Sequence, residues 1–417
     1  MIRYTPETRL MTYQANDSFI NGYGLLIGMN SDSKPWVAII LVVILFGAPV
    51  LSCFWPQDAP EEELTFTGKV TGLSSYNQPK LDIKADELFD KGIELGAEFR
   101  VETQDRTFED AILMKGYLGL FMFDIYVNIE NDGYVSIGCM GKLITADEGS
   151  EITLTKTGTS DRYQKTPQYN KGHTNNRADY QSDEQFANFY EVIGGDIKPG
   201  ILYRSFSPLY DPAKQSRSPY VNELAEKANI KFEIALSYSD SSVAAAVKSL
   251  DGYCLDLCEN GDYVAPSMGY LYFQQKEKTV KVLDSILEND GAYLIHCNVG
   301  RDRTGFTCLL LQALCGCTAD EMKADEAKAF CNLCNIEVGS EEYRAVCAST
   351  YDRNIFLIAN PDKIDDIFEI NWKNIDVSSV DTYSAAYNYC TGHLGMSESD
   401  VNGVIAKLCG EPNHSQA

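Results

Sequence analysis

The chain has 417 residues, 44% of them hydrophobic and 23% charged, which is typical of a globular protein with two or three domains. Its net charge of −25 argues against a nucleic-acid partner, because nucleic-acid binding requires a basic face. The 13 cysteines are odd in number and scattered over a long chain, so free thiols are expected rather than a disulfide scaffold.

Residues 36–54 (WVAIILVVILFGAPVLSCF) carry no charge and are just long enough to cross a bilayer. The most apolar part, residues 37–46, also has the length of a signal-peptide core. Residues 50–53 (VLSC) resemble a lipoprotein box, in which Cys53 would carry the lipid. A transmembrane anchor, a cleaved signal and a lipidated cysteine are therefore all open.

The charges that flank this segment predict its orientation. Arg3, Arg9 and Lys34 lie in the N-terminal tail, residues 1–35, and three glutamates follow at 61–63. Positive charge marks the cytoplasmic side of a membrane segment. We therefore expect a cytoplasmic tail, a cell membrane partner and the rest of the chain outside the cytoplasm.

Residues 60–158 are predicted to form a small all-β domain, a barrel or a sandwich. The short stretches EFRVET, DIYVNI, GYVSIG and EITLTK are rich in β-branched and aromatic residues, and Asn131-Asp132-Gly133 is a turn signal. The layout of residues 117–146 resembles the C-terminal β-domain of S-adenosylmethionine hydrolases. The nucleoside-binding half of those enzymes is missing, so a binding or spacing role is expected.

The polar stretch at residues 159–185 is predicted to be a linker or a surface loop. Strands and helices alternate over residues 170–412, which predicts an α/β domain with a mostly parallel central sheet, followed by helices. The expected strands are residues 200–205, 231–238 and 292–296, and the expected helices are 275–290, 305–316 and 397–410.

The sequence HCNVGRDRTG, residues 296–305, lies between an expected buried strand and an expected helix. A phosphate bound there would meet backbone N–H groups of Asn298, Val299, Gly300 and Arg301 at the positive end of the helix. The same field lowers the pKa of Cys297, so that more of it is the nucleophilic thiolate. The pattern predicts phosphoryl transfer through a cysteinyl-phosphate intermediate.

The other side chains of this loop have roles that suit the same chemistry. Arg303 can hold two phosphate oxygens with its planar guanidinium, and Thr304 can donate its hydroxyl to the sulfur. His296 can orient the loop by hydrogen bonding. Zinc binding by His296 and Cys297 is not expected, since adjacent residues at a strand end point to opposite sides.

His296, Cys297, Arg303 and Thr304 fill the pattern H-C-x5-R-[ST], in which the chain resembles the protein tyrosine phosphatase superfamily. The bacterial branch has H-C-x-x-G-K-D-R-T-G, and here Arg301 replaces the lysine. Residues 193–208 resemble the opening strand region of that branch, with Arg204 and Ser205 in its Y-R-S motif. The resemblance covers about residues 175–412, and it implies a three-layer α/β fold and phosphomonoester hydrolysis without metal or cofactor.

The general acid is open at this level. Asp302 lies inside the loop and is slightly favoured, while Asp240, Asp256 and Asp262 lie upstream and none is in a W-P-D string. The expected function is a membrane-anchored, extracytoplasmic phosphatase that hydrolyses phosphomonoesters, with phosphotyrosine protein as the favoured substrate. A phosphoinositide or inositol-phosphate phosphatase, a silent phosphate-binding module and a β-domain receptor are the alternatives.

Overall fold

The computed structural model describes residues 63–160, 163–211, 216–348 and 352–410. The apolar segment predicted at residues 36–54 and the N-terminal tail lie outside these ranges. Within them, no helix combines the length and the apolar character that a membrane crossing requires.

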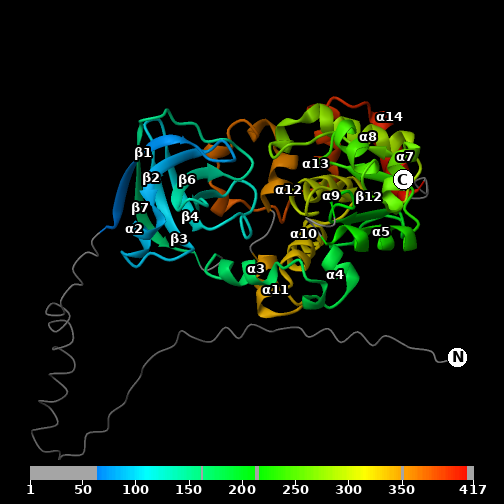
Figure 1. Cartoon of the computed structure of the whole chain (residues 1–417). Helices are drawn as coiled ribbons and strands as arrows, with labels where there is room; N and C mark the ends of the chain where they lie inside the picture. The colour runs from blue at the N-terminus through cyan, green and yellow to red at the C-terminus, as the bar shows by residue number, and fades with distance from the viewer. Residues whose placement is uncertain (1–62, 161–162, 212–215, 349–351, 411–417) are drawn as a thin grey trace, which may run out of the picture. The chain divides into compact units, whose positions relative to one another are not determined.

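The all-β region predicted in the first half of the chain is a closed barrel of seven strands (Figure 1). Neighbouring strands run in the order β1-β2-β6-β5-β4-β3-β7, and every pair is antiparallel except β4–β5. A short helix, α2 (Ala85–Phe89), follows β2. The strands are β1 (Thr65–Leu73), β2 (Pro79–Lys84), β3 (Ala97–Glu102), β4 (Thr107–Met114), β5 (Ile125–Ile129), β6 (Tyr134–Cys139) and β7 (Glu151–Thr159).

The turn signal in this region forms the hairpin that its residues predict. Asn131, Asp132 and Gly133 connect β5 to β6, and Gly133 has a φ of 83°, which glycine adopts without a Cβ clash. The Gly133 N–H donates to the carbonyl oxygen of Glu130 at 2.9 Å. The turn therefore fixes the register of two central barrel strands.

The prediction of a linker or surface loop over residues 159–185 was wrong. The segment contains α3 (Thr166–Gly172), the turn η1 (Arg177–Asp179) and the start of α4 (Asp183–Ala187). Tyr169 and Tyr180 are buried within it. Tyr169 packs on Phe330, and Tyr180 packs on Phe186 and accepts a hydrogen bond from Arg217. The polar composition of the segment conceals these contacts with the α/β part.

The α/β part contains a five-stranded sheet in the order β11-β10-β12-β9-β8. Strands β9 to β12 run parallel to one another, and the edge strand β8 runs antiparallel to β9. This agrees with the predicted mostly parallel sheet. The strands are β8 (Tyr190–Glu191), β9 (Leu202–Ser205), β10 (Phe232–Ala235), β11 (Tyr263–Val264) and β12 (Tyr293–His296).

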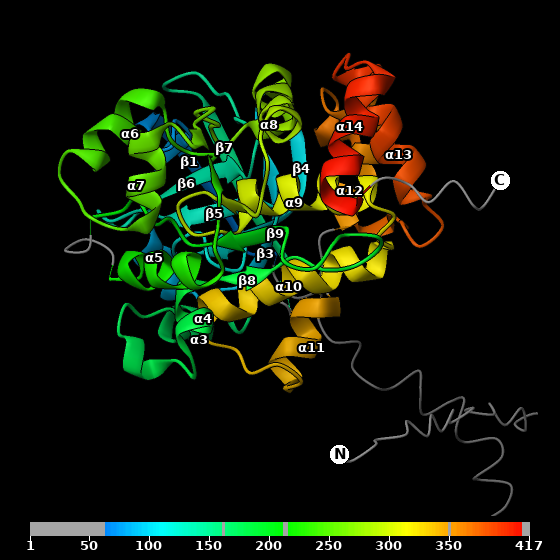
Figure 2. The same cartoon turned by 90° about the vertical axis from the view of Figure 1, so that its right-hand side faces the viewer.

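Helices cover both faces of this sheet, because successive residues of the buried strand β12 point to opposite sides. Leu294 belongs to the apolar cluster that includes α5 and α7, whereas Tyr293 and Ile295 belong to the cluster that includes α8 and α9. Figure 2 shows α5, α6 and α7 on one side and α12, α13 and α14 on the other. The helices are α5 (Ser218–Lys227), α6 (Asp240–Val247), α7 (Tyr253–Asn260), α8 (Lys276–Glu288), α9 (Asp302–Leu314), α10 (Ala319–Cys334), α11 (Glu341–Ala348), α12 (Asp352–Ala359), α13 (Thr382–Asn388) and α14 (Glu398–Cys409).

The barrel and the α/β part share one apolar core within residues 63–417. Phe123 of the barrel stacks on Trp372 with ring centroids 5.2 Å apart, and it also meets Phe273 at 5.4 Å. The buried carboxylate of Asp124 binds the Arg353 guanidinium at 2.5 Å. These contacts join two regions that are distant in sequence.

Candidate active site

The loop at residues 297–301 connects the end of β12 to the first turn of α9, the strand–loop–helix unit that the sequence predicts. Gly300 sits at its tightest point with a φ of +70°. A Cβ at this position would lie 2.2 Å from the carbonyl oxygen of Ser205 on β9. Both the conformation and the close approach therefore require glycine.

The carbonyl groups of this loop point outward to the surrounding scaffold. The Asn298 oxygen accepts from the Ser207 N–H at 3.3 Å, and the Val299 oxygen accepts from Asn188 Nδ2 at 3.2 Å. The Gly300 oxygen accepts from Arg204 Nη2 at 2.9 Å. In a trans peptide the next N–H points away from the carbonyl, so these bonds turn successive N–H groups toward the centre of the loop. Such an arrangement is of the kind that binds anions, and the loop is called the cradle below.

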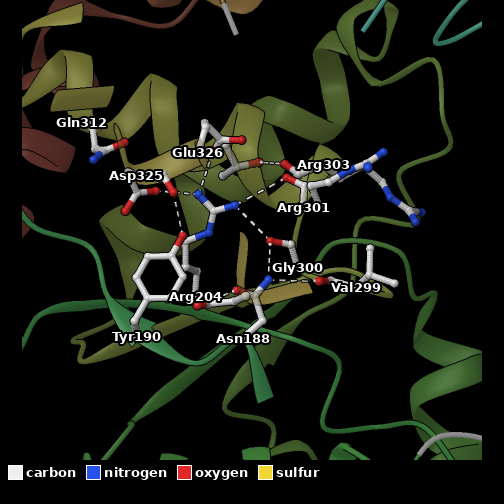
Figure 3. A network of polar contacts seen from close by, with 12 residues as sticks. Asn188, Tyr190, Arg204, Val299, Gly300, Arg301, Arg303, Gln312, Asp325 and Glu326 are labelled. Atoms are coloured by element: carbon white, nitrogen blue, oxygen red, sulfur yellow. Dashed lines mark hydrogen bonds and ion pairs between the residues drawn. The ribbon is translucent and has the colours of Figure 1, made fainter. Parts of the chain in front are cut away.

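Arg204 is the fully buried side chain that anchors the cradle (Figure 3). Its Nη1 binds the carboxylates of Asp325 and Glu326, each at 2.6 Å, while Nη2 reaches the loop carbonyls. Burial raises the pKa of Glu326 to about 7, and the Arg204 charge opposes that rise. Gly305 leaves room for this pair, since a Cβ there would lie 2.2 Å from Glu326 Oε2. The loop is therefore held by charged hydrogen bonds in the interior.

Cys297 lies at the bottom of the cradle and is 1% exposed. Burial by itself raises the pKa of its thiol, but the Arg303 charge and the Thr304 side chain and N–H lower it to about 7. The Thr304 hydroxyl is buried and forms no complete hydrogen bond with a described residue. It lies close enough to the Cys297 sulfur to lower the pKa of the thiol. A large fraction of Cys297 is thus thiolate near neutral pH.

Arg303 is held in place by the loop that follows β11. Its Nη1 donates to the Met268 carbonyl at 3.0 Å, and the Tyr270 ring lies 5.1 Å from its guanidinium carbon. The side chain is only 7% exposed. It is therefore pre-positioned beside Cys297, where a bidentate contact to phosphate needs it.

His296 is fully buried and paired with a carboxylate that the sequence analysis did not single out. Its Nε2 lies 2.6 Å from Glu233 Oε1 on the neighbouring strand β10, and its Nδ1 lies 3.2 Å from the Cys297 carbonyl oxygen. The pair fixes the imidazole against the backbone of the cysteine. This geometry suits the orienting role predicted for His296.

Arg301 and Asp302 contact each other at the start of α9. Arg301 Nε donates to Asp302 Oδ1 at 2.9 Å, and the Arg301 guanidinium lies 5.8 Å from the Phe330 ring. The Asp302 side chain is 24% exposed and close enough to Cys297 to raise its pKa. Asp302 is thus a carboxylate next to both the thiol and Arg303.

The upstream aspartates are placed differently. Asp240 begins α6 after β10, so it lies at the same edge of the sheet as the loop and is exposed. Asp262 precedes β11 and lies level with the start of β12, roughly 13 Å along the strand from Cys297. Asp256 is exposed on α7. The loop that follows β11 and contacts Arg303 carries no carboxylate in residues 265–271.

Several residues of this frame were not identified from the sequence. Glu233 had a signal, because it is a lone acid inside the apolar stretch KFEIALSY. Asn188, Asp325 and Glu326 had no such signal in the sequence, since they lie in polar stretches. Asn188 contacts the loop, and the two acids contact Arg204, only in the folded chain. Arg204 was named in a motif, but its contacts with the loop carbonyls come from the structure.

Comparisons with known proteins agree with this geometry. Residues 261–410 match the model of the tyrosine phosphatase family, and this range includes the cradle and α9. The chain therefore contains a region that resembles tyrosine phosphatases, and a phosphatase is the general class that it indicates. No curated protein matches the chain.

Among solved structures, a crystal structure of an uncharacterized conserved protein from Thermotoga maritima is similar to part of the chain. The two are 16% identical, with a TM-score of 0.21. The match covers 22% of this chain and 38% of that protein, and it carries no argument about function.

Proposed function

We propose that the protein hydrolyses phosphomonoesters, with Cys297 as nucleophile and without a metal or other cofactor. The observation that carries the proposal is a buried thiol with its pKa lowered to about 7, inside a loop whose carbonyl groups are bound outward by Asn188 and Arg204. A purely structural cysteine in this interior would have its pKa raised by burial.

The first chemical step is transfer of the phosphoryl group to sulfur. The phosphate oxygens bind the loop N–H groups and the Arg303 guanidinium, which stabilise the charge that develops on them. Cys297 Sγ attacks phosphorus, the phosphorus–oxygen ester bond breaks, and the neutral form of Asp302 donates a proton to the leaving oxygen.

The second step regenerates the thiolate. Water attacks the phosphorus of the cysteinyl phosphate, Asp302 accepts one proton from it, and the sulfur–phosphorus bond breaks to release inorganic phosphate. Thr304 lies where its hydroxyl can donate to the departing sulfur. His296 and Glu233 hold the backbone of Cys297 in the same position through both steps.

The substrate that we propose is phosphotyrosine in protein, with small phosphorylated compounds as a second class. The alternative of a phosphoinositide or inositol phosphate would use Arg301 to bind additional phosphates. In the structure the Arg301 guanidinium contacts Asp302 and Phe330 instead, which favours a substrate with a single phosphate. The alternative of a silent phosphate-binding module predicts binding without turnover.

One experiment tests these alternatives together. The protein is incubated in chelator with a phosphotyrosine peptide, a phosphoinositide and an inositol phosphate, and released phosphate is measured. When turnover of a peptide with radiolabelled phosphorus in its phosphotyrosine is stopped by rapid denaturation, labelled phosphate should remain on Cys297. Binding of vanadate without any phosphate release would support the silent module and contradict the proposed function.

The proposed location follows from the sequence of residues 36–54 and its flanking charges. We propose that the catalytic part lies outside the cytoplasm, attached to the membrane through this segment. Protease added to intact cells, or to cells without their wall, should then degrade the phosphatase region. Full protection would reverse the orientation.

A further inference from the structure

The barrel carries an exposed tyrosine that contacts the candidate active site. Tyr76 lies in the turn between β1 and β2, and its ring centroid is 6.0 Å from that of Tyr270 in an edge-to-face arrangement. Tyr270 in turn lies over the Arg303 guanidinium at 5.1 Å. The barrel therefore reaches the side chain that would bind phosphate through a single intervening ring.

Both rings keep a large exposed surface although they touch each other. Tyr76 is 43% exposed and Tyr270 is 50% exposed. Burial raises the pKa of the Tyr270 hydroxyl and the Arg303 charge opposes that rise, while Cys297 is close enough to add to it. The exposed ring surface therefore lies beside the thiol and the arginine and is not covered by the described protein.

The turn that presents Tyr76 is held by its own hydrogen bonds. The Ser74 N–H donates to the Gln78 carbonyl at 2.8 Å, and Ser74 Oγ accepts from the N–H groups of Tyr76 and Gln78, both at 3.3 Å. The Gln78 side chain accepts from the Ile144 N–H at 3.0 Å. Asn77 adopts a φ of 58°, a conformation that asparagine tolerates. The ring is thus presented by a pre-organised turn.

A second barrel ring supports Tyr76 from behind. Tyr117 meets Tyr76 edge to face with centroids 4.6 Å apart, and it is itself packed on Tyr126 at 5.5 Å. Asn128 Nδ2 donates to the Tyr117 hydroxyl at 3.4 Å. Four tyrosines from two regions of the chain therefore form a continuous row that ends at Arg303.

We infer that Tyr76 of the barrel and Tyr270 form an aromatic wall at the mouth of the phosphate cradle, and that this wall selects aryl phosphates such as phosphotyrosine. A phosphate held by Arg303 must direct its ester group out of the cradle past the ring that lies on the same guanidinium. An aromatic leaving group gains edge-to-face contacts there, and an aliphatic one does not. The inference rests on the proposed function and assigns the barrel a part in substrate selection.

The test uses the full chain with Tyr76→Ala, Tyr76→Phe and Tyr383→Ala. Tyr383 on α13 is a matched control, because it is 41% exposed and lies away from the candidate site. It is close to Cys409, and Cys409 contacts Cys315 at the end of α9 opposite the cradle. Steady-state kinetics with a phosphotyrosine peptide are compared with inhibition by orthovanadate, which has no aromatic ring.

Tyr76→Ala should raise KM for the peptide about three- to tenfold, the range that one aromatic contact supplies, and leave the vanadate inhibition constant within about twofold. Tyr76→Phe and Tyr383→Ala should keep the wild-type KM. Unchanged KM in Tyr76→Ala, an equal loss of vanadate binding, or an equal loss with a soluble inositol phosphate would each overturn the inference. A wild-type protein that hydrolyses none of these substrates would instead overturn the proposed function.

Discussion

The two ends of α9 place buried cysteines in opposite electrostatic surroundings. Cys297, before the N-terminal end, is 1% exposed and has its pKa lowered to about 7. Cys315, at the C-terminal end, is 2% exposed, and the neighbouring thiol of Cys409 together with burial raises its pKa. Equal burial therefore gives opposite outcomes, and nearby charge decides between them.

The helix itself contributes to this difference. Its N-terminal end carries partial positive charge and free N–H groups, which favour a thiolate, and its C-terminal end carries partial negative charge, which disfavours one. Arg303 and Thr304 lie in the first turn and add to the favourable end. Cys317, just beyond the other end, has its pKa raised to about 12 by burial and by Glu321.

Exchanging each cysteine for serine gives the largest expected contrast. Cys297→Ser should reduce hydrolysis of p-nitrophenyl phosphate by at least about 10³-fold, because an alcohol at this position is not ionised near neutral pH. Cys315→Ser, the matched control, should stay within about twofold of wild type when rates are corrected for folded protein by circular dichroism. Normal turnover in Cys297→Ser would remove the proposed mechanism.

Replacing Arg303 tests whether charge alone makes the N-terminal end special. Arg303→Lys keeps the charge but loses the planar pair of donors, so kcat should fall about 10²-fold. The pKa of the Cys297 thiol, measured from the pH dependence of alkylation, should change little, in contrast to the large fall in kcat. Near-wild-type kcat would mean that the arginine acts through charge and packing only.

Asp302 is the acid whose effect should depend on the leaving group. Asp302→Asn should slow phenyl phosphate by about 10²-fold or more and p-nitrophenyl phosphate much less, because a general acid matters most for a basic leaving group. Equal slowing of both substrates would make Asp302 a structural residue, and Asp240 would be tested next.

The smallest expected effect is the pH dependence that separates the two thiols. When the pH falls below the Cys297 pKa of about 7, the thiolate becomes protonated. The rate of alkylation by iodoacetamide and kcat/KM should then both fall roughly tenfold per pH unit. Above that pH both should level off, and vanadate should protect. Alkylation of Cys315 should stay slow across this range, as mass spectrometry of digested protein would show.

Some parts of the fold were readable because their signals are local. Thr318 and Glu321 form a capping box, a pattern that can be recognised in the sequence, and it begins α10, with Thr318 Oγ1 accepting from the Glu321 N–H at 3.3 Å. Strand β12 and helix α9 were found from one buried run and one apolar helix. In contrast, β1, β2 and β4 of the barrel were missed. Two glycines interrupt β1, and β4 ends in an apolar run, so neither alternates cleanly, whereas the alternation of β2 covers only six residues.

Cys297 and Arg303 could be proposed from the sequence as nucleophile and phosphate-binding arginine, because strand, loop and helix are contiguous within a few residues. Backbone geometry alone brings Cys297, Arg303 and Thr304 to one helix end. The contacts of the supporting frame could not be predicted, although Arg204 stands in a motif and Glu233 had a signal. Asn188 and Arg204 reach the loop, and Met268 reaches Arg303, only when the segments that carry them pack together. Tyr76 is more distant from the loop in sequence than any of these residues, because it lies in the barrel and meets the site through Tyr270. The sequence by itself determined the strand, the loop and the helix that bring Cys297 and Arg303 together, because these elements follow one another in the chain. Tertiary packing decided how the loop is held and which side chains surround it, because contacts between distant segments leave no local pattern in the sequence.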